Sequence, residues 1–147
     1  LLVTAPSFAN DFEEGLDAIH GTDYDKALAK LRPLASEGHA PAQYNLGVMY
    51  EWGNGVPQDD VEAMKWYRLS AGQSHRDAQN NLGAMYSKGE GVAQNFVEAL
   101  KWFVVSADNG SEGGRKNIDI VEKRMTSGQI TQAKKLAREW IKQHPKK

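Results

Sequence analysis

The sequence predicts an all-α fold built from about four repeated units of two helices each. Three observations lead to this prediction: a segment of the chain recurs after 36 residues, apolar residues within it follow helical spacing, and glycine-containing turns separate the helical stretches. Repetition at such a period is typical of solenoid proteins, in which each unit buries its apolar face against its neighbours. We therefore expect a single repeat domain over residues 10–147.

The recurring segment has three parts, and each part returns at the same offset. The stretch AQYNLGVMY begins at Ala42 and returns as AQNNLGAMY at Ala78. The loop GNGV at Gly53 returns as GEGV at Gly89, and EAMKWY further on returns as EALKWF. A match of this length identifies two complete units.

Degenerate copies flank the complete units, as expected for terminal repeats that face water on one side. The segment KALAKL around Ala27 stands 36 residues before Ala63, and the last copy loses two residues from its inner loop. The units then span about 10–39, 40–75, 76–111 and 112–144. The expected helices occupy residues 10–20, 23–37, 40–52, 59–72, 76–88, 95–109, 112–125 and 127–143.

The first helix of a complete unit carries an apolar stripe, and the second helix begins at a capping residue. Leu46, Met49 and Tyr50 stand at i, i+3 and i+4 and so share one face. Gly47 lies on this face as well, where it would let the partner helix approach closely. In three of the units, the second helix starts with a pattern similar to a capping box. The pairs are Asp59 with Glu62, Asn95 with Glu98, and Thr126 with Gln129.

The tryptophans divide into two groups. Trp66, Trp102 and Trp140 lie in the second helices of their units, where we expect them in the core. Trp52 follows Tyr50 by two residues and so points about 200° away from it around the helix. It is either an anchor on a binding surface, where tryptophan is enriched, or it packs beneath the loop that begins at Gly53.

At these residues the sequence resembles the Sel-1-like repeat, a family related to the tetratricopeptide repeat. The shared pattern is A-x-x-x-L-G-x-x-Y, then G-x-G-V, then A-x-K-W-[YF], and residues 40–110 carry it strongly. The resemblance implies antiparallel helix pairs stacked into a right-handed superhelix with a concave groove. It also implies a role in protein–protein recognition and, for bacterial members, frequent export.

The resemblance further implies that the first helix of each unit lines the groove. The positions carried over are mostly aromatic or acidic in the first complete unit, small or polar in the second, and mostly basic in the last. They are Tyr44, Val48, Glu51, Trp52, Asn80, Ala84, Ser87, Lys88, Lys116, Ile120, Lys123 and Arg124. The last unit departs from the pattern, because Asp119 replaces the glycine and Glu122 replaces the tyrosine. We expect a ligand with an apolar anchor near Trp52 and a negative group near the last unit.

The first nine residues resemble the end of a secretory signal peptide. The chain begins LLVTAPSFA, in which apolar residues come first and Ser7 and Ala9 are small residues at the −3 and −1 positions of a cleavage site. We therefore expect processing between Ala9 and Asn10 and a periplasmic or secreted protein. A simple apolar N-terminus is the alternative.

The net charge of the chain and its distribution limit the kinds of partner that we expect it to bind. The net charge is −1, which argues against a dedicated nucleic-acid-binding protein, since such proteins are usually strongly basic. The charge is uneven, because residues 111–147 hold 10 Lys/Arg and 4 Asp/Glu. We define the C-terminal basic cluster as Lys134, Lys135, Arg138, Lys142, Lys146 and Lys147. It is either a solvated helix face or a surface for an acidic partner.

No residue pattern indicates catalysis, a cofactor or a metal. The absence of cysteine excludes disulfides, thiolate metal sites and cysteine nucleophiles. The four histidines lack the i, i+4 pairing of a metal-binding helix. The glycine pairs at Gly53 and Gly89 precede no Gly-Lys-Ser/Thr, so we expect turns rather than phosphate loops. No run of 18 apolar residues is present to span a membrane.

These observations predict a protein-interaction module that is not an enzyme and needs no cofactor. It would bind a protein or peptide in its groove. An immunity protein that neutralises a toxin is one alternative. An enzyme of the family's cysteine-rich, β-lactam-binding branch is another, which the absence of cysteine disfavours. Neither the identity of the partner nor the oligomeric state has a signature in the sequence.

Overall fold

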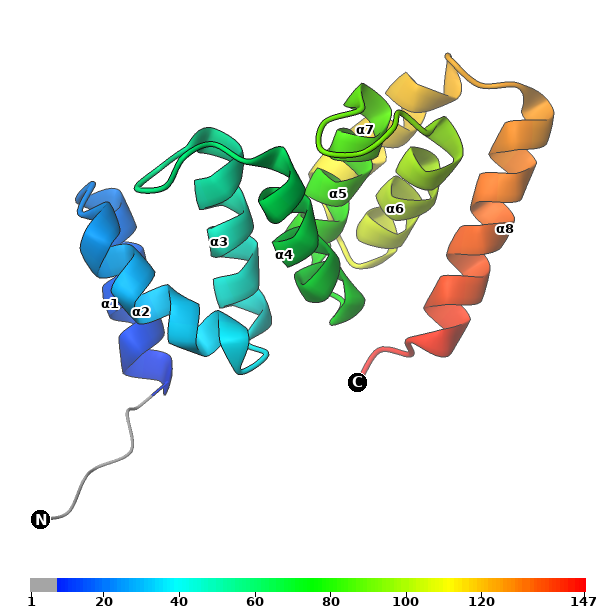
Figure 1. Ribbon diagram of the computed structural model, residues 1–147. Helices are drawn as coiled ribbons and strands as arrows, with labels where there is room; N and C mark the ends of the chain where they lie inside the picture. Colours follow the sequence, from blue (N-terminus) through cyan, green and yellow to red (C-terminus); the bar gives the residue numbers. More distant parts are fainter. Residues whose placement is uncertain (1–7) are drawn as a thin grey trace, which may run out of the picture.

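The computed structural model describes residues 8–147 and has eight α-helices in this range (Figure 1). They are α1 (Phe8–His20), α2 (Tyr24–Ser36), α3 (Ala40–Trp52), α4 (Asp60–Gly72), α5 (Arg76–Lys88), α6 (Phe96–Asp108), α7 (Glu112–Glu122) and α8 (Ser127–Gln143). The described residues contain no strand, which confirms the predicted all-α fold. Residues 1–7, which hold most of the predicted signal-peptide remnant, lie outside the described residues.

The helices form an elongated array in which consecutive elements from α1 to α7 lie side by side (Figure 1). Helix α1 pairs with α2, α3 with α4, and α5 with α6. Each pair packs on the next through contacts of α2 with α3, α4 with α5, and α6 with α7. This arrangement, in which each unit contacts only its neighbours, is that of a solenoid. No helix of the described range is long and apolar enough to cross a membrane.

The predicted helix boundaries agree with the observed ones to within three residues. The largest difference is at α7, which ends at Glu122 rather than at residue 125. Helix α1 begins at Phe8, so the processing site predicted between Ala9 and Asn10 falls in its first turn.

The helix starts differ from the predicted capping boxes in one respect. Asp59 and Asn95 accept hydrogen bonds from the third backbone N–H of their helices, as predicted. Their own N–H groups, however, donate to the carbonyls of Tyr50 and Tyr86, at 2.9 Å each. Because those donors are already satisfied, no reciprocal bond from the third side chain is needed. The full capping box forms only at Thr126 among the described helices.

The other caps were missed in the sequence. His39 and His75 are the N-caps of α3 and α5, and their Nδ1 atoms accept from the N–H groups of Ala42 and Ala78. Ser111 takes the same place before α7. Histidine is not among the favoured capping residues, so the sequence gives no capping signal at His39 and His75.

Two glycines let the helices of the complete units approach closely, as predicted. A Cβ at Gly47 would stand 2.5 Å from Cε1 of Tyr67, and one at Gly83 would stand 2.7 Å from Cδ1 of Phe103. Gly15 has the same role in the first unit, where the neighbour is Leu31. The glycine on the apolar stripe therefore makes room for a large side chain of the partner helix.

A ladder of buried glutamines joins successive units. Gln79 is fully buried; its Nε2 donates to the carbonyl of Ala71 at 3.1 Å, and its Oε1 accepts from Asn109 at 2.9 Å. Gln43 makes the equivalent bonds one unit earlier. The residue 36 positions after Gln79 is Arg115, which is exposed, so the ladder ends there.

The predicted core positions of the tryptophans are only partly right. Trp102 is buried, but Trp66 and Trp140 are half-buried at the edges of the apolar clusters. The rings of Trp102 and Trp140 meet edge to face with centroids 5.5 Å apart, and His144 stacks on the outer side of Trp140 at 3.8 Å.

The last unit departs from the hairpin geometry of the others. Helix α8 packs mainly along α6 and joins α7 through side chains, such as the 2.8 Å ion pair of Lys134 with Glu122. The reason lies in two positions that pack together in the complete units. Asp119 of α7 stands where a glycine would admit an aromatic ring, and α8 offers Ala137 in place of that ring, which packs toward the core of α4, α5 and α6.

Candidate functional site

The predicted groove positions lie on the surface formed by α3, α5 and α7, which we call the A-helix face. The structure brings six of the twelve positions into two pockets on this face. The two pockets share one residue, Lys88.

The first pocket, called the Trp52 pocket, has a volume of about 220 Å³. It is lined by Glu51, Trp52, Gln58, Asp60, Lys88 and Glu90. The Trp52 side chain is 70% exposed, more than any other large apolar residue described. Within the loop between α3 and α4, Gly53 lies against Gln58. Of the two interpretations of Trp52, packing beneath the loop is therefore wrong, and an exposed aromatic remains.

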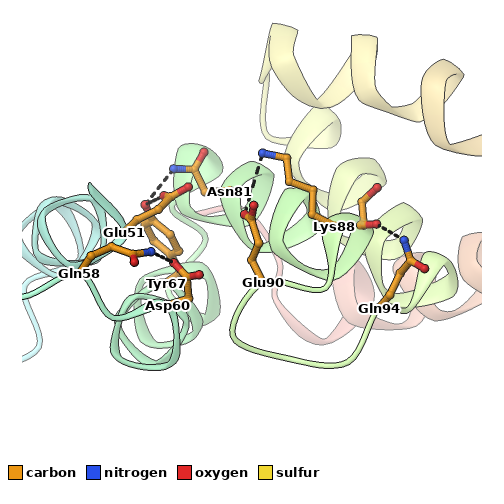
Figure 2. A network of polar contacts seen from close by, with 9 residues as sticks. Glu51, Gln58, Asp60, Tyr67, Asn81, Lys88, Glu90 and Gln94 are labelled. Carbon is orange, nitrogen blue, oxygen red and sulfur yellow. Dashed lines mark hydrogen bonds and ion pairs between the residues drawn. The ribbon is translucent and has the colours of Figure 1, made fainter. Parts of the chain in front are cut away.

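Polar side chains of the Trp52 pocket are held by their neighbours (Figure 2). The Tyr67 hydroxyl donates to Glu51 and accepts from Asn81 at 3.2 Å. Burial, together with the bond to Glu51, raises the pKa of Tyr67 above its ordinary value, so the phenol stays protonated. Gln58 donates to Asp60 at 2.8 Å, whereas Lys88 reaches Glu90 only at 3.9 Å.

A close backbone approach places Glu90 at the pocket. Gly91 has φ +68°, and a Cβ there would stand 2.5 Å from the carbonyl oxygen of Asp60. Only glycine fits this contact without displacing the loop. The loop after α5 thus rests on the start of α4, which brings together carboxylates from two units.

The second pocket, called the Ile120 pocket, has a volume of about 170 Å³. It is lined by Ala84, Ser87, Lys88, Phe103, Asn117, Ile120 and Val121. Ile120 is 61% exposed. Lys88 is the sole charged side chain among these lining residues, so this pocket is apolar with a cation at its rim.

The remaining predicted positions are outside both pockets. Tyr44 and Val48 are half-buried against the core, and the Tyr44 ring stacks on His75 with centroids 4.9 Å apart. Asn80 accepts a hydrogen bond from Asn117 at 2.9 Å, which links α5 to α7. These three side chains are thus engaged in packing.

The basic positions of the last unit, Lys116, Lys123 and Arg124, line neither pocket. Lys116 and Lys123 are exposed, and Lys123 is the C-cap of α7. The Arg124 guanidinium lies 4.7 Å from the ring centroid of Phe96, at the start of α6.

Sequence reasoning missed three residues of the Trp52 pocket: Gln58, Asp60 and Glu90. They come from loops and a helix start, whereas the resemblance assigned the groove to first helices only. The sequence does contain a signal that Glu90 could be functional, because Glu90 occupies the variable position of the recurring G-x-G-V loop.

Comparisons with known proteins agree with this architecture. The model of the Sel1 repeat family matches residues 40–75 and 76–111. A solved structure of a Sel1 repeat protein from Oxalobacter formigenes is 33% identical, with a TM-score of 0.70 over 77% of this chain and 88% of that chain. A protective antigen present in uropathogenic Escherichia coli strains, which displays an SLR fold, is 31% identical with a TM-score of 0.88. That match covers 94% of this chain and 30% of the antigen.

A relative of known role matches over a shorter stretch. The exopolysaccharide production negative regulator of Rhizobium meliloti (strain 1021) is 36% identical over 56 residues, which are 38% of this chain. The chain spans 21% of the length of that regulator. Sel1 repeat proteins generally mediate protein–protein interactions. The repeat pattern, the helix pairs and these matches together show that this chain belongs to the Sel1 repeat family.

Proposed function

We propose that this chain is a non-enzymatic interaction module that binds a protein or peptide partner on its A-helix face. The observation that carries the proposal is Trp52, which is 70% exposed and lines a pocket. Tryptophan is one of the residue types enriched among the few that dominate binding energy at interfaces. The Ile120 pocket adjoins the Trp52 pocket at Lys88 and would extend the contact over two units.

Affinity in this proposal comes from several units acting together. Each pocket is below the size of a typical small-molecule site, which is roughly 300–1,000 Å³. A partner that reaches both pockets would bury more surface than either one offers. This favours a polypeptide over a small ligand.

Site-specific photo-crosslinking tests this proposal in the native host. A photoreactive benzoylphenylalanine in place of Ser87 lies in the Ile120 pocket, and one in place of Leu69 is the control. Leu69 is 48% exposed on α4 and lines neither pocket. We expect a discrete crosslinked partner from Ser87 and none from Leu69. Adducts from Leu69 alone would place the partner on another face.

We also propose that the protein acts outside the cytoplasm, on the strength of the small residues at positions 7 and 9. Mass spectrometry of the gene product from its native host tests this. The expected N-terminus is Asn10, and recovery of a cytoplasmic protein that retains residues 1–9 would contradict it.

A further inference from the structure

The Trp52 pocket has an excess of negative charge. Its lining holds three carboxylates, Glu51, Asp60 and Glu90, against the single ammonium of Lys88. The carboxylates come from three elements, the end of α3, the start of α4 and the loop after α5, so their convergence is a product of the fold. Asp60 is oriented by Gln58, and Glu51 by Tyr67.

The aromatic side chain in this pocket is of the kind that attracts cations. The face of an exposed indole binds a guanidinium or ammonium group, and tryptophan does so best among the aromatic residues. A carboxylate next to such a ring adds charge-assisted hydrogen bonds to the same cation. Helices α3 and α5 also end at the pocket, and the C-terminal end of a helix favours positive charge.

We infer that the Trp52 pocket receives a basic side chain of the partner, and arginine in preference to lysine. This inference rests on the proposed function and names the group that the partner inserts. The flat guanidinium stacks on an indole and pairs with carboxylates through two parallel bonds, which a lysine ammonium cannot do. The apolar anchor expected from the sequence is thereby replaced by an arginine, whose aliphatic stem supplies the apolar contact.

Lys88 has an opposing role in this inference. Its ammonium reaches Glu90 at 3.9 Å, a contact that an incoming guanidinium would replace. Lys88 is 62% exposed and also lines the Ile120 pocket, so it can turn toward that side. Lys88 therefore competes with the partner's arginine, and its removal should strengthen the binding of a cation.

Nuclear magnetic resonance of the labelled full chain tests the inference with three probes: the N-acetyl, N′-methylamide derivatives of arginine, leucine and glutamate. Each is titrated to about 50 mM, because a single side chain binds weakly. The chain has four tryptophans, and Trp52→Phe assigns the indole signal of Trp52 by its loss. We expect the arginine derivative alone to shift this signal with saturation.

Charge variants make the test specific. Lys88→Met should tighten binding of the arginine derivative by about two- to fivefold, and Glu90→Gln should weaken it by a similar factor. Glu112→Gln removes an equal charge from an exposed position of α7 outside the pocket and should change nothing. Circular dichroism of each variant confirms the helical fold.

The outcomes separate this inference from the proposed function. Equal shifts from the leucine derivative, or no saturating shift from the arginine derivative, would overturn the inference. So would a Lys88→Met variant that binds the arginine derivative more weakly than wild type does. The proposed function would survive these results if Ser87 still crosslinks to a partner, and it fails separately if that crosslink is absent.

Discussion

Gly47 in α3 lies directly against the ring of Tyr67 in α4, so close that a Cβ at Gly47 would stand 2.5 Å from Cε1 of the ring. The ring cannot move aside freely, because it is fully buried and its hydroxyl bonds both Glu51 and Asn81. One contact thus fixes the spacing of a helix pair and the orientation of Glu51 at the Trp52 pocket.

The first prediction concerns this contact. Gly47→Ala should destabilise the protein by about 1–3 kcal/mol through overpacking, despite the better helix propensity of alanine. Urea unfolding followed by circular dichroism measures the change. Gly72→Ala is the matched control, because Gly72 ends α4 and a Cβ there meets nothing within 4 Å. Equal stability of Gly47→Ala and Gly72→Ala would contradict the close approach.

The second prediction concerns the glutamine ladder. Gln79→Ala removes the side-chain amide that donates to the Ala71 carbonyl and accepts from Asn109, and so leaves two polar groups without these hydrogen bonds at a buried site. We expect a loss of about 1–3 kcal/mol in the free energy of unfolding. Gln132→Ala, at an exposed position of α8, should change it little. The ladder would have no role in stability if both variants unfolded at the same urea concentration.

The third prediction is a loss of stability in mild acid. Burial lowers the pKa of His39 and His75, and near His75 the Arg76 charge lowers it further while Asp77 opposes this. Protonation would remove the Nδ1 acceptor of each cap and put a positive charge at a helix N-terminus. The unfolded chain has the ordinary value of about 6.5. The stabilising contribution is therefore complete above that pH and is lost as the pH falls through the lowered folded value.

Serine caps provide the test of this pH dependence, because Ser111 already caps α7. The double variant His39→Ser with His75→Ser should keep its free energy of unfolding more nearly constant from about pH 7.5 to 5.5. His20→Ser, at the exposed end of α1, serves as the control. A double variant that loses as much stability as wild type over this range would show that the caps do not titrate.

The fourth prediction concerns the basic end of the A-helix face. Lys123→Ala with Arg124→Ala should chiefly slow association with an acidic partner segment and reduce the dependence of that rate on salt. Both side chains should contribute, because both are exposed and the contact of Arg124 with the uncharged Phe96 ring leaves its charge in place. Stopped-flow or surface plasmon measurements at two salt concentrations give the rates. An unchanged association rate would exclude this end from the encounter.

Much of the fold follows from the sequence because the two complete units repeat the same local physics. Leu46 and Met49 are buried at helical spacing, and Gly47 and Gly83 face aromatic rings, as the pattern predicts. The course of α8 could not be predicted in this way. The path of α8 depends on Asp119 and Ala137, which stand where the complete units have a glycine and an aromatic ring that pack together. A degenerate copy of the repeat does not indicate where its second helix packs in their place.

The Trp52 pocket was predictable where it lies on the first helices of the units, and not in the loops or at the start of α4. Trp52 was found because it leaves the apolar stripe. Asp60 and Glu90 were missed, because only the approach of Gly91 to the start of α4 brings them to the pocket. Contacts between the loops of successive units depend on how the units stack on one another. The spacing of residues within one unit does not reveal this stacking.

The most direct test of the central claim is the affinity of the partner, once captured by crosslinking at Ser87, for wild type and for Trp52→Ala. We predict that Trp52→Ala weakens binding by roughly 2 kcal/mol or more while the unfolding temperature stays unchanged, because the side chain is 70% exposed. Leu69→Ala, which truncates another exposed apolar side chain, should bind as wild type does. The account is contradicted if isothermal calorimetry gives Trp52→Ala the same dissociation constant as wild type.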